Sequence, residues 1–309
     1  MSELREGSRS KRQEGMCDAK AINRTMMHTA LEMARNIRAS AIVIYVDVLG
    51  GVAELEEMPP SEIKLILASS VVEPEELTNI TSDLVRVPRI DFNRTGQVKI
   101  SLMLAFARGL INDGDRLICL SGSRRNRTLD HLVVVNVGRE LEFFSSQQAN
   151  MMKEMPRPEV FETLLSLALE LGREGREGKP AGTVFVLGDH ERVLQFSRQM
   201  VINPFGGVPE EERNVMDPLL KGSIKEFSAI DGAFVIREDG VVMAAGRHLD
   251  ASGEKLSLPQ GLGSRHLAAA GITAITSAVA LVVSESTGDL RIFNDGKMFM
   301  EIEKTTAEM

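Results

Sequence analysis

Apolar residues in the first half of the chain alternate between two spacings. Between residues 19 and 38 they recur every third or fourth position, as in Ile22, Met26 and Met33, which is typical of an amphipathic helix. The continuously apolar stretch 41–48 predicts a buried strand. Four further short apolar runs predict strands at 65–68, 84–87, 116–120 and 132–137. Helices are predicted between them, at 73–80 and 97–109. This alternation predicts an α/β layer with a mostly parallel sheet.

The pattern changes after a polar, proline-containing stretch at 145–158. An amphipathic helix is predicted at 159–173 and a buried strand at 183–187. Two apolar runs, 233–236 and 241–245, flank Asp239 and Gly240 and predict a hairpin. Three short strands close the chain, so the second half is predicted to be an α/β domain with a mixed sheet.

The length of 309 residues and the break near residue 150 indicate two domains. We expect a flexible N-terminal tail at 1–18, an α/β domain at 19–150 and a second domain at 156–309.

Composition excludes several classes of function. A net charge of −8 and only 4% aromatic residues argue against nucleic-acid binding, which uses basic surfaces and stacking side chains. The two cysteines, Cys17 and Cys119, lie far apart and indicate neither a disulfide framework nor a zinc site. No apolar run reaches the roughly 18 residues of a membrane span and no secretory signal is visible, so we expect a cytoplasmic protein with no membrane partner.

The first candidate for chemistry is the segment Asp231, Gly232 and Ala233, at the mouth of a predicted strand. A carboxylate there could hold a divalent metal and polarise a hydroxyl nucleophile, while the glycine lets another group approach the backbone. By itself the segment is better explained as the common Asp-Gly turn.

The second candidate is a glycine-rich loop that leads into an alanine-rich helix. Gly261 and Gly263 precede Ser264, Arg265 and His266 in the expected first turn. Free backbone N–H groups and a positive dipole end suit a polyphosphate there. Cations at a helix N-terminus are unfavourable unless an anion is bound, which favours a ligand site over an ordinary packed helix.

A third stretch, ending in Ser284 and Glu285, runs from a strand into a turn with a hydroxyl and a carboxylate. In order and spacing the three stretches resemble the catalytic domain of the diadenylate cyclases. That family has a DGA motif, then a glycine-rich RHR segment, then a strand ending in Ser-Glu. This sequence departs from the pattern at Leu267, where the third motif cation is missing, and at Ser264, where threonine is usual.

The domain order also resembles the archaeal-type cyclases, whose first domain is similar to the C-terminal domain of pyruvate kinase. The stretch 109–122 suggests this likeness. In pyruvate kinases that region binds a phosphorylated effector, and a small phosphorylated effector is a possible partner of the N-terminal domain here. The alternative is a solvated basic loop. The side chains able to bind such a ligand are Ser121, Ser123, Arg124, Arg125, Arg127 and Thr128.

The resemblance implies condensation of two ATP molecules into cyclic di-AMP and two pyrophosphates. Two catalytic domains would self-associate face to face, each binding one ATP. It implies that Asp231 holds Mn²⁺ or Mg²⁺ and acts with Gly232, Ala233, Arg265 and His266. The ATP-binding residues implied are Gly232, Gly261, Gly263, Ser264, Arg265, His266, Ser284 and Glu285. The alternative is an inactive sensor of the same fold that binds ATP or cyclic di-AMP, with Leu267 as a sign of decay.

Overall fold

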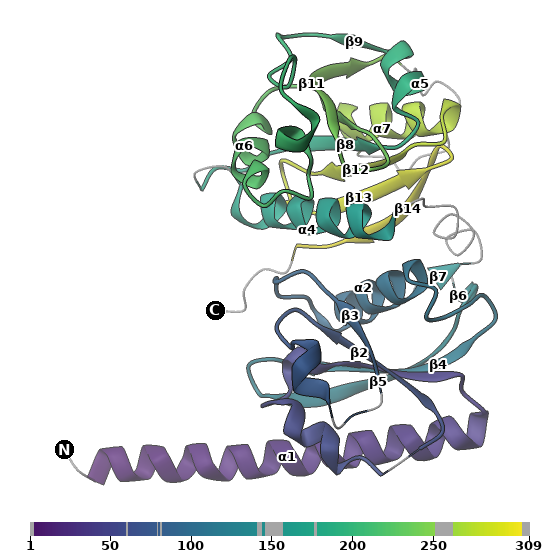
Figure 1. Ribbon diagram of the computed structural model, residues 1–309. Helices are drawn as coiled ribbons and strands as arrows, with labels where there is room; N and C mark the ends of the chain where they lie inside the picture. Colours follow the sequence, from purple (N-terminus) through teal and green to yellow (C-terminus); the bar gives the residue numbers. More distant parts are fainter. Residues whose placement is uncertain are drawn as a thin grey trace. The chain divides into compact units, whose positions relative to one another are not determined.

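The computed structural model divides the chain into two compact units, Met1–Glu154 and Met155–Met309, each described here by itself (Figure 1). The structure describes residues 3–59, 61–78, 80, 82–140, 144–145, 157–175, 178–250 and 262–304. In the described part of the chain, none of the helices is both long and apolar enough to cross a membrane.

The N-terminal unit is built on a five-stranded sheet with strand order β3-β2-β1-β4-β5. Its strands are β1 (Ala41–Tyr45), β2 (Lys64–Ser69), β3 (Asp83–Arg86), β4 (Arg116–Ser123) and β5 (Thr128–Asn136). The first four are parallel, which confirms the prediction of a mostly parallel sheet. β5 pairs with β4 in the antiparallel direction because only a short turn joins the two, whereas a parallel pair needs a long crossover.

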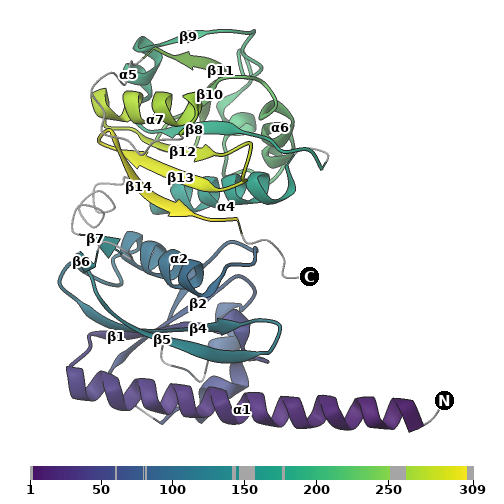
Figure 2. The same cartoon turned by 180° about the vertical axis from the view of Figure 1, so that it is seen from behind.

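Two helices, α1 (Glu3–Ile37) and α2 (Arg94–Ala107), cover opposite faces of this sheet (Figures 1 and 2). Three short 3-10 helices lie in the connections and a small strand pair follows the sheet. They are η1 (Val46–Val48), η2 (Val52–Glu57), η3 (Pro74–Leu77), β6 (Arg139–Glu140) and β7 (Phe144–Ser145). The helix expected at 73–80 is thus only one 3-10 turn.

α1 differs from the prediction at its start, because it includes residues that were expected to form a flexible tail at 1–18. Its described C-terminal part docks on the sheet through buried Met27, Ala30 and Ala34. Once such a docked segment has nucleated a helix, each further turn costs little, and Gly7 and Gly15 are the only strong breakers in the preceding sequence.

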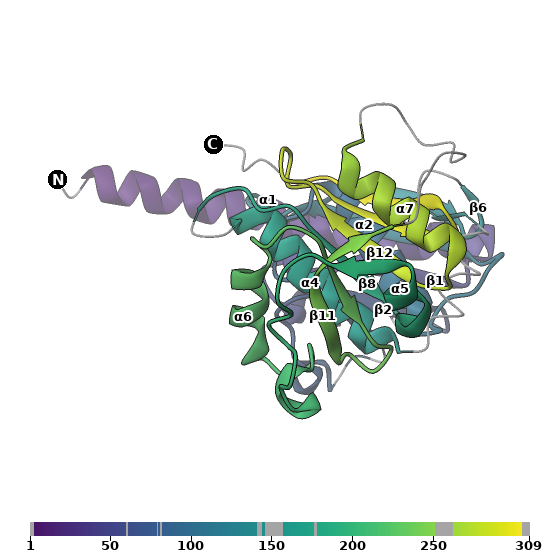
Figure 3. The same cartoon turned by 90° about the horizontal axis from the view of Figure 1, so that it is seen from above.

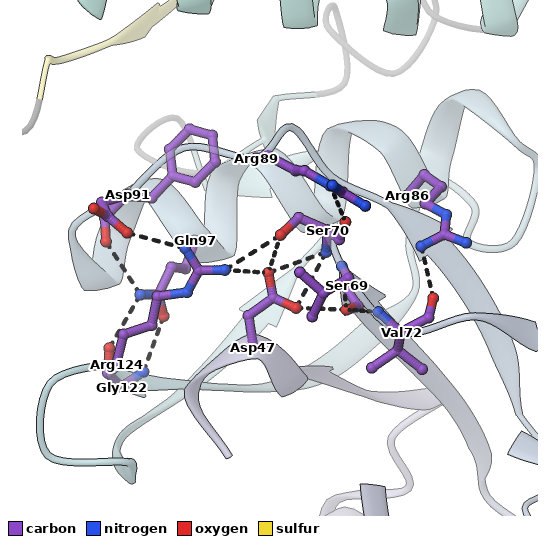
Figure 4. Close-up of polar contacts among 12 residues, drawn as sticks. Asp47, Ser69, Ser70, Val72, Arg86, Arg89, Asp91, Gln97, Gly122 and Arg124 are labelled. Carbon is purple, nitrogen blue, oxygen red and sulfur yellow. Dashed lines mark hydrogen bonds and ion pairs between the residues drawn. The ribbon is translucent and has the colours of Figure 1, made fainter. Parts of the chain in front are cut away.

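A polar network joins the carboxyl ends of three strands in this unit (Figure 4). The Asp47 side chain, two residues after the end of β1, is 0% exposed. Its carboxylate accepts one hydrogen bond from the Ser69 hydroxyl and one from the Ser70 hydroxyl, at the end of β2. Arg124, after β4, donates to the same carboxylate at 2.6 Å and to Asp91 at 2.9 Å. A buried carboxylate with this many donors is fully compensated, so the network fastens the strand ends together.

The C-terminal unit contains a mixed seven-stranded sheet with strand order β14-β13-β12-β8-β10-β11-β9, as predicted. β8 and β10 are parallel, and the other neighbours are antiparallel. The strands are β8 (Thr183–Leu187), β9 (Ser197–Gln199), β10 (Ala233–Ile236), β11 (Val242–Leu249), β12 (Val279–Val283), β13 (Leu290–Asn294) and β14 (Lys297–Ile302).

The central strands are buried on both faces of the sheet, which explains why β12 is entirely apolar and β8 is apolar after Thr183. Val184, Val186 and Val282 share a core with the alanines of α7 (Ser264–Ile275), while α4 (Pro158–Glu174) also packs against β12. α6 lies on the other side of this unit from α7 (Figure 3). The helices are α4 (Pro158–Glu174), α5 (His190–Gln195), η4 (Glu210–Arg213), α6 (Leu220–Phe227) and α7 (Ser264–Ile275).

The buried carboxylate of the N-terminal unit gives a first prediction. Asp47→Ala should lower the free energy of unfolding by about 3 kcal/mol, because it leaves two serine hydroxyls without their acceptor and removes the buried one of the two carboxylates that hold Arg124. Asp91→Ala removes the other, 60% exposed partner of Arg124 and should cost less than about 1 kcal/mol. Urea denaturation of both variants checks this, and equal losses would contradict it.

Candidate functional site

The mixed direction of the sheet brings two of the predicted motifs to one edge. Ala233 at the start of β10 pairs with Val184 at the start of β8. Val283 at the end of β12 pairs with Thr183 in the same strand. The residues just before β10, including Asp231, and those just after β12, including Glu285, therefore lie at the same edge.

The third motif reaches this edge at the N-terminus of α7. Gly263 is the N-cap and has no side chain to cap the helix, and the first turn contains no acidic residue. The first N–H groups of any helix lack acceptors within it, so this end presents donors and a positive dipole. Behind it, Ala269, Ala270 and Ile272 are fully buried in the core shared with the sheet. The small side chains hold the helix close, which fixes where its first turn lies.

Arg265 connects the three motifs. Its Nη1 donates to Glu285 Oε2 at 2.9 Å, and its Nη2 lies 3.5 Å from Asp231 Oδ1. Both carboxylates are exposed, Glu285 at 60% and Asp231 at 79%. Ion pairs of such exposure are worth at most about 1 kcal/mol, so a stronger anionic ligand can replace either carboxylate.

A cavity of about 600 Å³ opens beside Arg265. This volume lies within the usual range for small-molecule sites, roughly 300–1,000 Å³. Asp231 lies outside the lining and reaches the cavity through Arg265. Gly261, predicted to bind ATP, lies outside the described residues. The lining residues are Pro180, Gly263, Ser264, Arg265, His266, Val283, Ser284, Glu285, Ser286 and Arg291.

His266 forms part of the cavity wall and is only 6% exposed. Its Nε2 lies 3.1 Å from Nη1 of Arg291, while its Nδ1 is buried with no hydrogen-bond partner among the described residues. Burial lowers the pKa of the imidazole, and the positive charge of Arg291 lowers it further. The ring is therefore neutral near pH 7 and can donate or accept, but carries no charge of its own.

Two glycines let the backbone segments of the site approach one another. Gly232 has φ +110°, and a Cβ there would lie 2.7 Å from the carbonyl carbon of Gly246. Gly182, which the sequence did not single out, lies against Glu285 and Arg265, and a Cβ there would lie only 2.8 Å from the Cβ of Glu285. The glycine of the Asp231 segment is thus required by the close approach of β11, in addition to any ligand.

The remaining predicted residues take different positions. Ser264 is exposed at the first position of α7 and lines the cavity. Ser284 is buried, and its hydroxyl lies 3.3 Å from that of Ser286. Leu267 is 45% exposed and does not line the cavity. Three further residues of the lining, Arg291, Ser286 and Pro180, could not be predicted, because nothing in their local sequence sets them apart from ordinary strand and turn residues.

In the N-terminal unit, the predicted effector residues are not all available. Arg124 is held by Asp47 and Asp91, and the Ser121 hydroxyl lies 2.9 Å from His131 Nδ1. Arg127 lines a cavity of about 290 Å³ together with Lys20. Its other lining residues are Ala19, Gly50, Gly51, Ala53 and Glu54.

Comparison with known proteins gives matches to both units. Residues 170–298 match the family model described as DisA bacterial checkpoint controller nucleotide-binding. Residues 23–145 match the model of a probable sensor domain, DacZ_P. The predicted likeness of the N-terminal unit to pyruvate kinase stays a prediction.

Two curated relatives align over most of the chain. The diadenylate cyclase of Methanocaldococcus jannaschii is 31% identical over 298 residues, covering 88% of this chain and 94% of that protein. The diadenylate cyclase of Haloferax volcanii is 34% identical over 238 residues, covering 75% and 84%. A crystal structure of DacA from Staphylococcus aureus aligns with a TM-score of 0.33 at 20% identity, covering 47% of this chain and 87% of that one, which is too low to support an argument.

The backbone of Gly232 gives a prediction about the site. Gly232→Ala should lower the free energy of unfolding by roughly 2–4 kcal/mol and displace Asp231, since a Cβ meets backbone and φ is unfavourable. Gly222→Ala is the matched control, because a Cβ at this position in α6 meets no atom within 4 Å. Alanine is the better helix former, so this variant should raise the free energy of unfolding by up to about 1 kcal/mol. Thermal unfolding of the two variants measures both. A neutral Gly232→Ala would show that this backbone segment is not constrained as described.

Proposed function

The chain belongs to the diadenylate cyclase family, and we propose that it condenses two ATP molecules into cyclic di-AMP and two pyrophosphates. The observation that supports this most directly is the meeting of Asp231, Arg265 and Glu285 at the uncapped N-terminus of α7. The site offers donors for phosphate oxygens and a carboxylate for a hydroxyl group. ATP as the substrate agrees with a cytoplasmic location.

The phosphates of one ATP bind at the N-terminus of α7 in this proposal. The first-turn N–H groups, the Ser264 hydroxyl and the Arg265 guanidinium are donors directed at the cavity. As the phosphates enter, Arg265 exchanges its contacts with Glu285 and Asp231 for contacts with phosphate oxygens. The exchange frees Asp231 beside the reacting groups.

The chemistry consists of two equivalent displacements. The 3′-oxygen of each ATP forms a bond to the α-phosphorus of the other ATP, and the bond from that phosphorus to the bridging oxygen breaks, which releases pyrophosphate. Each hydroxyl loses a proton, and Asp231 is the carboxylate placed to favour that loss. Positioning and charge stabilisation account for most catalysis of phosphoryl transfer, so the fixed edge of the sheet matters as much as any one residue.

The site can supply part of the coordination shell of a divalent cation. Among the described residues, no three histidine, cysteine, aspartate or glutamate side chains gather into a complete metal cage. Mg²⁺ commonly uses only one or two carboxylates together with substrate phosphates, and exposed Asp231 can supply one. Mn²⁺ or Mg²⁺ held in this way would neutralise charge on the phosphoryl oxygens.

The N-terminal unit has a separate role in the proposal. Its 290 Å³ cavity is lined by the cationic residues Lys20 and Arg127 and by Glu54, whose carboxylate already accepts hydrogen bonds from Asn23 and the Gly50 N–H, and the region matches a family described as a probable sensor domain. A small phosphorylated effector is the ligand that these charges suit.

Asp231 and Arg265 should affect different steps. Asp231→Asn should abolish formation of cyclic di-AMP while ATP affinity stays within about tenfold, because the carboxylate acts on the nucleophile more than on ground-state binding. Arg265→Ala should also weaken ATP binding, by roughly 10- to 100-fold, since a charge-assisted contact is worth about 1.5–3 kcal/mol. Products from ATP and Mn²⁺ are resolved by mass, and affinity is measured by calorimetry.

Asp250→Asn is the matched control, since this exposed aspartate pairs with Arg198 away from the cavity. It should behave as the unmodified chain does. ATP binding without any product from the unmodified chain would instead support the inactive sensor. Normal turnover in Asp231→Asn would remove that residue from its assigned role.

The product's two equivalent bonds predict how activity depends on assembly. One domain with one ATP cannot place both hydroxyls in line, whereas two facing copies related by a twofold axis do so by symmetry. Specific activity should therefore rise with protein concentration until the facing pair is saturated. Light scattering alongside the assay checks this, and full activity from a monomer would refute the shared site.

A further inference from the structure

The buried imidazole of His266 has one engaged and one unengaged nitrogen. Nε2 lies 3.1 Å from Arg291 Nη1. Among the described residues Nδ1 has no partner at full hydrogen-bond geometry, and it lies on the side of Gly263, the N-cap of α7, whose backbone favours a proton on the ring. A buried polar atom without a well-aligned partner is uncommon in native proteins and calls for an explanation.

The chemistry of arginine decides which nitrogen carries the proton. A guanidinium donates hydrogen bonds and cannot accept them, so Nε2 must be the acceptor of the Arg291 contact. The ring is neutral, because burial and the two neighbouring cations, Arg291 and Arg265, disfavour a second proton. The single ring proton is therefore on Nδ1.

Arg291 is itself fixed independently of His266. It lies opposite Glu301 in the β13–β14 pair, and its Nε and Nη2 are 2.7 Å and 2.6 Å from the same Glu301 oxygen. Asp289 lies 3.7 Å from Nη2. The side chain is only 17% exposed, so the strand pair and not solvent sets the direction in which Nη1 points.

The tautomer matters because phosphate oxygens only accept hydrogen bonds. A bare Nδ1 would direct a lone pair toward the N-terminus of α7, whereas Nδ1–H adds a donor to the donors already there. We propose that Arg291, oriented by Glu301, is a positioning residue of the phosphate site that holds His266 in the Nδ1–H tautomer. This inference rests on the proposed function only in taking the cavity as a phosphate site.

The tautomer can be observed directly in the full chain. Isotope labelling of histidine gives a small set of signals, since the chain has 5 histidines, and the signal lost in His266→Gln identifies the ring. We expect a protonated Nδ1 and an unprotonated Nε2. Arg291→Lys keeps a donor-only group and should keep this tautomer. Arg291→Gln can donate or accept and should give a mixture. The reverse tautomer in the unmodified chain would overturn the proposal.

Binding of pyrophosphate, measured by calorimetry, tests the consequence for the anion. Arg291→Gln should weaken it by roughly five- to tenfold, the effect of about one hydrogen bond, and Arg291→Lys should stay within about threefold. Arg198→Gln, an exposed arginine away from the cavity, is the control and should change nothing. Thermal unfolding of each variant reports on folding separately. Equal losses for the Lys and Gln variants would show that Arg291 acts only through packing.

These measurements separate the inference from the cyclase assignment. Pyrophosphate is not turned over, and the tautomer does not depend on any product. If the unmodified chain made no cyclic di-AMP but the variants followed the expected order, the positioning role would stand and the proposed reaction would fall. If the unmodified chain made cyclic di-AMP but Arg291→Gln bound pyrophosphate normally, the proposed reaction would stand and the positioning role of Arg291 would fall.

Discussion

The positive end of α7 and the guanidinium of Arg265 lie together, and the protein balances both with carboxylates that water reaches. Glu285 and Asp231 are 60% and 79% exposed, so their attraction to Arg265 is screened and weak. A phosphate brings more charge and several acceptor oxygens to the same donors. The two carboxylates therefore hold Arg265 in position, and a phosphate ligand can replace them at little cost in free energy.

This interaction depends on the mixed direction of the sheet. Asp231 comes before a strand and Glu285 comes after one, so a purely parallel sheet would place them at opposite edges. Because β12 runs against β8 while β10 runs with it, both carboxylates meet Arg265 at one edge. A shift of one residue in either pairing would reverse which side chains face α7, so the buried valines of these strands also fix the site.

The sequence predicted the parts of the site that have local signals. Asp231 and Gly232 form a turn pattern, and the glycines before α7 form a helix-start pattern, both of which depend on neighbouring residues alone. The order of strands and helices along the chain predicted that the first sheet is mostly parallel and the second mixed. Arg291 has no such local signal, because it is one residue of an ordinary strand. Its place in the site depends on contacts with Glu301 and His266, which are distant in the sequence or on another element. Helix ends were less predictable for a related reason, since docking far along α1 decides whether its first turns are helical.

The two units use arginine in opposite ways. Arg124 bonds to a carboxylate that is 0% exposed, so separating that pair would strand a buried charge and loosen three strand ends. Arg265 bonds to carboxylates in water, and separating those pairs costs little. An anion that binds the N-terminal unit must therefore use other cations. Lys20 and Arg127, in the proposed effector site, meet this condition, because they line a cavity with Glu54 and form no ion pair with any described residue, so an anion bound to them would leave the Asp47–Arg124 pair intact.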